Sequence, residues 1–184
     1  MRKVIAALNM TLDGMCDHTY GVVDEELHQH YAELIRDSGV ILYGRKTYEL
    51  MQFWPQLLEK PSGDRSMDEF AQAIDEVHKL VFSNTLQNSN WSTATIAHQS
   101  LLECVPELRQ MPGKNILIGS RSLIIQLLNN HLIDEFQIGI HPLIAGKGLR
   151  MFEGITNQVM LGLHKTKSLQ SGVTIFYYEP RAKR

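Results

Sequence analysis

The sequence predicts an α/β fold with three layers, in which a mixed, mainly parallel central sheet of about eight strands carries helices on both faces. Strand-like apolar runs alternate with helical periods along most of the chain, which is typical of parallel sheets covered by helices. After about residue 130 the strands follow one another without helices, and this predicts an antiparallel C-terminal edge. The 184 residues, 43% of them hydrophobic, suit one substantial core, so we expect residues 1–184 to form a single domain.

The elements follow in order from these patterns. Strands are expected near residues 2–9, 39–43, 79–83, 92–97, 115–118, 132–141, 157–168 and 172–179. A helix over about 24–37 is predicted by an acidic start and by apolar residues that share one face, namely Leu27, Tyr31, Leu34 and Ile35. A second helix near 67–78 has the same spacing at Met67, Phe70, Ile74 and Val77. Residues 59–66 are polar and predict a surface loop.

Composition excludes several classes of protein. A formal net charge of −2 gives no basic surface of the kind that nucleic acid requires. Cys16 and Cys104 lack the spacing of a disulfide framework or zinc knuckle, which fits a reducing compartment. No run approaches the ~20 apolar residues of a membrane span, and the apolar start of the chain meets Asn9 too soon for a signal peptide. We expect a cytoplasmic protein.

One strand end has the composition of a phosphate site. The apolar run 40–43 leads into Gly44, Arg45, Lys46 and Thr47. Glycine permits a sharp turn, and the free N–H groups of a helix starting near Lys46 would point at an anion. Two cations would favour a dianionic group such as the 2′-phosphate of NADP. The alternative is an ordinary helix start with two solvated cations.

Two further strand ends carry similar residues. Run 79–82 ends in Ser83 and Asn84, and run 115–118 ends in Gly119 and Ser120, before an apolar helix that starts near Ser122. In open α/β sheets ligands bind at the carboxyl ends of the strands. Three such ends therefore favour one extended ligand over three unrelated turns.

Segments spread over nearly the whole chain resemble a known family in their order and spacing. They are Thr11-Leu12-Asp13-Gly14, Pro142-Leu143-Ile144-Ala145-Gly146-Lys147-Gly148, and residues 4–8, 42–48, 54–55, 81–86, 116–119, 132–136 and 151–152. Together they resemble the dihydrofolate-reductase-like superfamily. Within it they are most similar to the branch that contains the reductase domain of the bifunctional riboflavin-biosynthesis deaminase-reductase.

The resemblance implies an NADPH site. The backbone of Ala7 would hold the nicotinamide carboxamide, and Gly44, Arg45, Lys46 and Thr47 would take phosphates. Ser83 and Asn84 would flank the adenosine ribose and its 2′-phosphate. Gly119 and Ser120 would pass under the pyrophosphate, with the helix from Ser122 lending its N-terminus. The family usually has a second glycine where Ser120 stands, so Ser120→Gly is expected to be tolerated.

The substrate side of the site is carried by two candidate catalytic residues, Asp13 and His28. In typical dihydrofolate reductases a helix carboxylate binds the pterin, and counting back from Gly44 puts that position at or near His28. An imidazole cannot make that bidentate contact, although it can deliver a proton. The alternatives are a half-exposed helix histidine and, for Asp13, an Asx-type turn before Gly14. Neither metal-binding nor nucleophile motifs occur.

These observations lead to one function and one alternative. We expect an NADPH-dependent reductase that transfers hydride to a pterin-like or ribosylaminopyrimidine-like small molecule. The alternative is a non-catalytic NADP(H)-binding module or sensor. We also expect a homodimer through the late strands, since runs 136–141 and 173–178 carry more apolar side chains than one sheet face needs.

Overall fold

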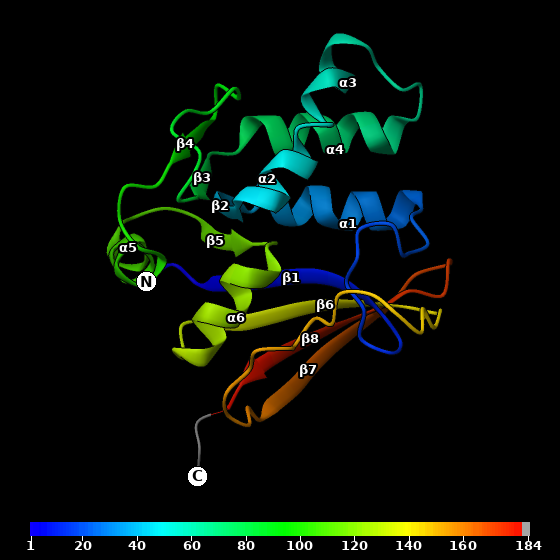
Figure 1. Cartoon of the computed structure of the whole chain (residues 1–184). Coiled ribbons are helices and arrows are strands. Elements are labelled where there is room, and N and C mark those ends of the chain that lie inside the picture. The colour runs from blue at the N-terminus through cyan, green and yellow to red at the C-terminus, as the bar shows by residue number, and fades with distance from the viewer. Residues whose placement is uncertain (182–184) are drawn as a thin grey trace.

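The computed structural model describes residues 1–181, in which eight strands form one sheet in the order β4-β3-β2-β5-β1-β6-β8-β7 (Figure 1). The strands are β1 (Val4–Thr11), β2 (Ser38–Gly44), β3 (Lys79–Phe82), β4 (Ala94–Ile96), β5 (Asn115–Ile118), β6 (Glu135–His141), β7 (Leu161–Ser168) and β8 (Thr174–Pro180). The six strands from β4 to β6 are parallel, and β8 and β7 are antiparallel. The predicted mixed sheet with an antiparallel C-terminal edge is confirmed.

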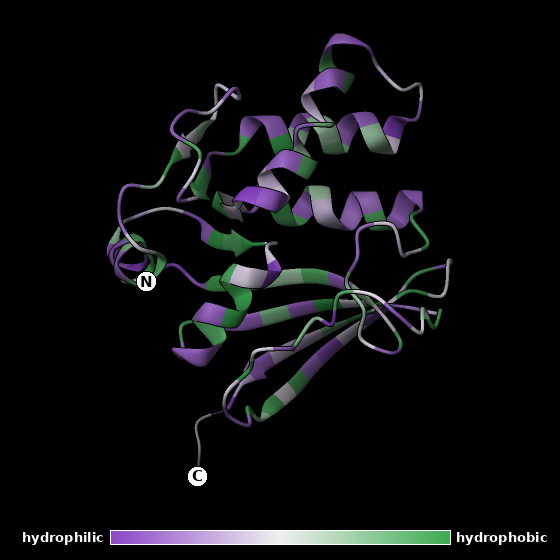
Figure 2. Ribbon diagram, viewed as in Figure 1, coloured by the Kyte–Doolittle hydropathy of each residue, from purple (hydrophilic) through white to green (hydrophobic). Residues whose placement is uncertain are grey.

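Helices cover both faces of the parallel part, as predicted. They are α1 (Glu25–Arg36), α2 (Arg45–Met51), α3 (Pro55–Glu59), α4 (Arg65–Glu76), α5 (Leu101–Gln110) and α6 (Arg121–Asn129). Alternate strand residues point to opposite faces, so Ile5 and Leu117 pack toward α1 and α4, whereas Val4 and Ile116 pack toward α5 and α6. Figure 2 shows the result as hydrophobic central strands between helices of mixed character.

Two helix starts are fixed by aspartates. The side chain of Asp24 accepts the N–H of Leu27 and begins α1, and that of Asp64 accepts the N–H groups of Ser66 and Met67 and begins α4. α4 therefore starts two residues before the predicted position. α5 was not predicted, because Pro106 interrupts its pattern, although a capping box between Ser100 and Glu103 marks its start.

β1 occupies the middle of the sheet. It pairs in parallel with β5 on one side, where Val4 lies opposite Ile116, and with β6 on the other, where Ile5 lies opposite Glu135. Both partners come more than a hundred residues later in the chain. The middle of the sheet is thus completed by long-range pairing on both sides of its first strand.

Much of the apolar surface of the antiparallel edge is buried against other parts of the same chain. Ile138 is 4% exposed and Ile175 is fully buried, so the expected surplus of apolar side chains on the late strands is smaller than the sequence indicates. Phe176 and Tyr178 stay half-buried and stack at 5.9 Å between ring centroids, and Leu163 on β7 is 50% exposed. Among residues 1–181, no helix has both the length and the apolar character of a membrane span.

Candidate functional site

The carboxyl end of β5 forms a step in the sheet. β5 ends at Ile118, which pairs with Leu42 and Ala6, while its neighbours β2 and β1 run on beyond it. A side chain added at Gly119 would place its Cβ 3.9 Å from both the carbonyl oxygen of Ala7 and the ring of Tyr43. Gly119 is exposed, although the residues on either side of it are buried. The structure therefore brings the predicted residues Ala7, Gly44 and Gly119 together around an open stretch of backbone.

Ser120 joins the ends of β2 and β5. Its Oγ accepts the backbone N–H of Gly44 at 2.9 Å, and the residue is 1% exposed. Removing this hydroxyl would leave a buried N–H without a partner, which typically costs about 1–3 kcal/mol. The contact argues against the expectation that Ser120→Gly is tolerated. The sequence alone does not show that the Ser120 hydroxyl has a partner 76 residues away.

Gly44 does not make the predicted sharp glycine turn. Its φ of −80° and ψ of 161° are ordinary extended values that any residue adopts. The close approach of α6 matters more, because a Cβ on Gly44 would lie 3.2 Å from the Oγ of Ser122. Glycine is favoured here by crowding between the end of β2 and the first turn of α6.

The helices that follow β2 and β5 start without a side-chain cap within the described residues. Gly44, which has no side chain, precedes α2, and Ser120, whose side chain accepts no hydrogen bond from its helix, precedes α6. α1 and α4 differ, since Asp24 and Asp64 cap them. The first N–H groups of α6, which follow directly after Gly119 and Ser120 and include that of the exposed Ser122, therefore have no side-chain cap and would favour a negatively charged ligand.

The predicted cations lie on the first turn of α2. Arg45 and Lys46 are exposed and Thr47 is half-buried. Arg45 forms an ion pair with Glu49 one turn along, at 2.9 Å. Its charge is therefore shared with a carboxylate, and its contribution to a bound phosphate is weaker than that of a free arginine.

Ser83 and Asn84 extend the row of strand ends. Phe82 pairs with Gly44, so the residues after β3 lie next to those after β2. The Oγ of Ser83 accepts the N–H groups of Thr85 and Leu86 at 3.1 and 3.0 Å, which makes it part of a tight turn. Asn84 is exposed, so its side chain is open to a ligand.

Asp13 holds two loops together. Its carboxylate accepts the hydroxyl of Thr11 and the backbone N–H groups of Ala145 and Gly146, the last two at 3.0 and 2.8 Å. These hydrogen bonds lower the pKa of Asp13 to about 2. The carboxylate is ionised and fully engaged at neutral pH. The geometry therefore favours the structural reading of Asp13 over proton transfer.

His28 lies in the helical layer. Its Nδ1 is 3.2 Å from the Oγ of Ser66, and its ring packs against Trp54 and Phe70, with centroids 5.9 and 5.8 Å away. Burial lowers the pKa of His28 below its ordinary value. These contacts with α4 and with the residue before α3 give His28 a packing role, and none of them joins it to the strand ends.

His141 is a residue at the same edge that sequence reasoning missed. It ends β6 opposite Thr11, is 1% exposed, and its Nδ1 accepts the N–H of Val22 at 3.0 Å. Its Nε2 has no hydrogen-bond partner among residues 1–181. The rule that ligands bind at carboxyl ends of parallel strands could have identified it, since β6 is the strand next to β1.

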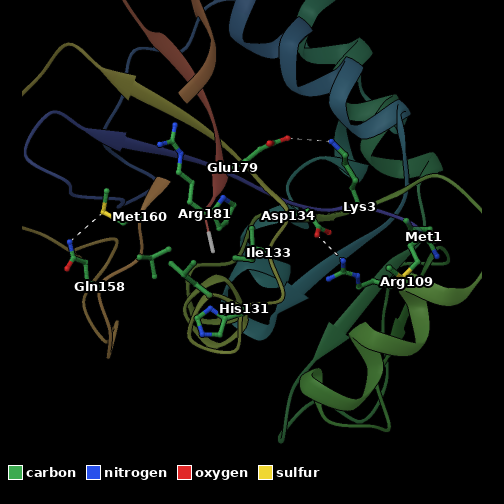
Figure 3. A pocket seen from close by; sticks show the side chains of 14 residues that line it. Met1, Lys3, Arg109, His131, Ile133, Asp134, Gln158, Met160, Glu179 and Arg181 are labelled. Carbon is green, nitrogen blue, oxygen red and sulfur yellow. Dashed lines mark hydrogen bonds and ion pairs between the residues drawn. The ribbon is translucent and has the colours of Figure 1, made fainter. Parts of the chain in front are cut away.

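A cavity of about 690 Å³ lies elsewhere, where β1 and β6 begin and β8 ends (Figure 3). Arg2, Arg109 and Arg181 are among its lining residues, and none of the predicted site residues lines it. Arg109 pairs with Asp134 at 2.9 Å, and Asp134 also accepts the N–H of Val4. These contacts fix the starts of β1 and β6 and are remote from the step at β5.

Comparison with known proteins gives relatives over the whole chain. The chain is 33% identical to the uncharacterized protein YyaP of Bacillus subtilis (strain 168) over 181 residues, which are 96% of this chain and 94% of YyaP. Its fold is similar to that of a putative riboflavin biosynthesis protein from Shewanella sp. PV-4, with a TM-score of 0.74 at 16% identity, covering 98% of this chain and 99% of the other.

A second solved structure is the diaminohydroxyphosphoribosylaminopyrimidine deaminase/5-amino-6-(5-phosphoribosylamino)uracil reductase of Thermotoga maritima. Its TM-score is 0.67 at 16% identity, over 98% of this chain and 57% of that longer protein. The family model of the RibD C-terminal domain matches residues 2–175. The resemblance inferred from the sequence is thereby confirmed, and the chain belongs to the family of the RibD C-terminal domain.

Proposed function

We propose that this protein is an NADPH-dependent reductase that transfers hydride to a pterin-like or ribosylaminopyrimidine-like heterocycle. The observation that carries the proposal is the step at the end of β5, where exposed backbone at Gly119 meets the uncapped start of α6. Family membership supports the reaction class, since a protein with a similar fold over part of its length is named as a deaminase and 5-amino-6-(5-phosphoribosylamino)uracil reductase. A small-molecule substrate follows from that class.

The residues present fit this cofactor. Gly119 offers exposed backbone at the step for the pyrophosphate, and the carbonyl oxygen of the buried Ala7, which lies beside it, would hold the nicotinamide carboxamide. Lys46 and Asn84 lie on the neighbouring strand ends, where the 2′-phosphate and ribose would bind. Bound NADPH would supply the hydride, and the chain's own residues at the strand ends would hold it in place. The ionised Asp13 does not supply the accompanying proton.

The alternative is a non-catalytic NADP(H)-binding module or sensor. One observation favours it: Asp13 and His28, the candidate catalytic residues, are both engaged in structural contacts. His141, with its unpartnered Nε2 at the same edge, is the residue we would test first for a role toward substrate.

The two readings are separated by turnover. NADPH fluorescence titration, with NADH for comparison, tests cofactor binding, and NADPH oxidation is then followed with a panel of reduced and oxidised pterins and ribosylaminopyrimidine phosphates. Binding with turnover of one compound supports the reductase. Tight NADPH binding without turnover of any compound supports the sensor, and equal affinity for NADPH and NADH contradicts both.

We also propose a homodimer through the antiparallel edge, in the cytoplasm. The half-buried Phe176 and Tyr178 and the exposed Leu163 are the apolar groups available for it. Ile138 and Ile175 are core residues, so a charge there would test folding rather than association. Light scattering at micromolar concentration should show a dimer that Leu163→Glu converts to a monomer. A wild-type monomer, or a dimer indifferent to this change, would contradict the proposed interface.

A further inference from the structure

Three side chains from three neighbouring strands meet on one face of the antiparallel edge. They are Glu135 on β6, Glu179 on β8 and His164 on β7, which we call the edge cluster. Their carboxylate oxygens and imidazole nitrogen all lie within 4.8 Å of one another. Figure 3 shows Glu179 beside Lys3, among the side chains that line the cavity. Glu135 begins β6, whereas the step lies where β5 ends. The cluster is separate from the proposed cofactor site.

Strand register and one irregularity build the cluster. Phe136 lies opposite Tyr178, which places the preceding residue Glu135 across from Glu179. On the other side Leu163 pairs with Tyr178 and Lys165 with Tyr177, so His164 is the extra residue of a bulge. A bulge redirects a side chain. It brings His164 next to Tyr177 in an edge-on contact, with ring centroids 6.0 Å apart, and within reach of the two carboxylates.

The charges of the cluster favour a cation. Carboxylates directly opposite each other on neighbouring strands repel. Lys3 provides the only ion-pair contacts to them within residues 1–181, and they are long, with Nζ 3.6 Å from Glu135 and 3.9 Å from Glu179. The side chain of Lys3 is 55% exposed, so this pairing is weak and easily displaced.

Glu135 is held in place for such a role. Its side chain is 12% exposed, and its Oε1 accepts the Nε2 of Gln137 at 2.9 Å. The Oε1 of Gln137, a residue that is 7% exposed, has no hydrogen-bond partner within residues 1–181. A buried amide that orients a carboxylate ligand is a common companion of metal sites. Sequence reasoning could not find the edge cluster, since Glu135, His164 and Glu179 are far apart along the chain.

We propose that the edge cluster binds one divalent transition-metal ion, of which Zn²⁺ is the type, through Glu135, His164 and Glu179. An imidazole with carboxylates suits zinc, cobalt or nickel better than magnesium or calcium, which prefer oxygen ligands. Ligands about 2.0–2.2 Å from a tetrahedral ion lie roughly 3.4 Å apart, so the exposed His164 and Glu179 must close by about an ångström. Lys3 is the cation that the metal displaces.

The proposal is tested by calorimetric titration of ZnSO₄ into the tag-free, EDTA-treated full chain, with Co²⁺ absorption as a second readout of coordination. We expect one equivalent of Zn²⁺, with affinity at least tenfold weaker in His164→Ala and in Glu179→Gln. His98→Ala is the matched control, because His98 is an exposed histidine outside the cluster, and it should leave affinity unchanged.

Lys3→Met should change Zn²⁺ affinity in the opposite direction. Removing a competing positive charge next to the ion should tighten Zn²⁺ binding by about fivefold. Thermal unfolding without metal establishes that each variant folds. The proposal is overturned if neither the wild-type chain nor Lys3→Met binds Zn²⁺. It is also overturned if His164→Ala leaves Zn²⁺ affinity unchanged, or if Mg²⁺ binds as tightly as Zn²⁺. A loss of affinity on Lys3→Met would likewise contradict the assigned role of Lys3.

Discussion

The carboxyl ends of the parallel strands fall into two halves, β1 with β6 and β2 with β5, whose hydrogen-bonding groups are engaged in opposite ways. Over β1 and β6, the carboxylates of Asp13 and Asp17 accept backbone N–H groups of Ala145, Gly146 and Leu149, and so tie the loop after β1 to the loop after β6. Over β2 and β5, the helices start without such acceptors in the described chain. Loops whose polar groups satisfy one another have a structural role, and strand ends that leave donors open suit an anionic ligand. The unpartnered Nε2 of His141 is the exception on the β1 and β6 side within the described residues.

The largest effect should come from filling the step. In Gly119→Val the branched side chain would fill the space beside the exposed backbone, between Ala7 and Tyr43. Gly119→Ala adds only ordinary contacts at 3.9 Å. We expect NADPH affinity to fall about 100-fold in the valine variant, roughly 2.7 kcal/mol, and only slightly in the alanine variant. Fluorescence titration measures it. If the valine variant binds within threefold of the wild type, the step is not the cofactor site.

The next effect concerns the link between the two open strand ends. Ser120→Ala and Ser120→Gly remove the acceptor of the Gly44 N–H and should lower the free energy of unfolding by about 1–3 kcal/mol. Urea unfolding measures the loss. Ser122→Ala is the control, because Ser122 is exposed and should change stability little. Equal stability of the Ser120 variants and the wild type would show that the Gly44 N–H finds another partner.

A smaller effect tests the cations of the open half. Arg45→Gln should weaken NADPH binding by about 1 kcal/mol and NADH binding by much less, because the lost contact is to the 2′-phosphate. Arg65→Gln is a closely matched control. Arg65 also begins a helix, is exposed, and pairs with a glutamate four residues along, Glu69, at 2.7 Å. Equal losses in both variants would mean that the effect is non-specific.

The smallest effect is confined to acid and tests the closed half. The pKa of Asp13 is about 2 in the folded protein against 3.8 ordinarily, so its stabilising contribution is present above about pH 4 and is lost as pH falls toward 2. Asp13→Asn should remove that part of the pH dependence. The measurement is the difference between the two stability curves, since other depressed carboxyls such as Asp64 titrate in the same region. Parallel stability curves for the wild type and Asp13→Asn would contradict the proposal that the ionised Asp13 holds the two loops together.

Sequence reasoning succeeded where the signal is local. The faces of α1 and α4 and the row of strand ends follow from short-range periodicity, and they are found close to their predicted positions. It could not reach contacts between distant segments. The hydrogen bonds of Asp13 to Ala145 and of Gly44 to Ser120 connect residues 132 and 76 positions apart. The packing of His28 against Trp54 and Phe70 likewise depends on how three helices meet.

The central place of β1 has a consequence for how the chain folds. Neither neighbour of β1 exists until β5 and β6 have been synthesised, because Val4 pairs with Ile116 and Thr11 with His141. At a synthesis rate of about 5–20 residues per second, the first strand waits roughly 6–26 s for its last partner on the ribosome. Pairing over such sequence separations is slow in two-state proteins. The first strand made is therefore among the last to be enclosed, and its apolar residues depend on protection from aggregation until then.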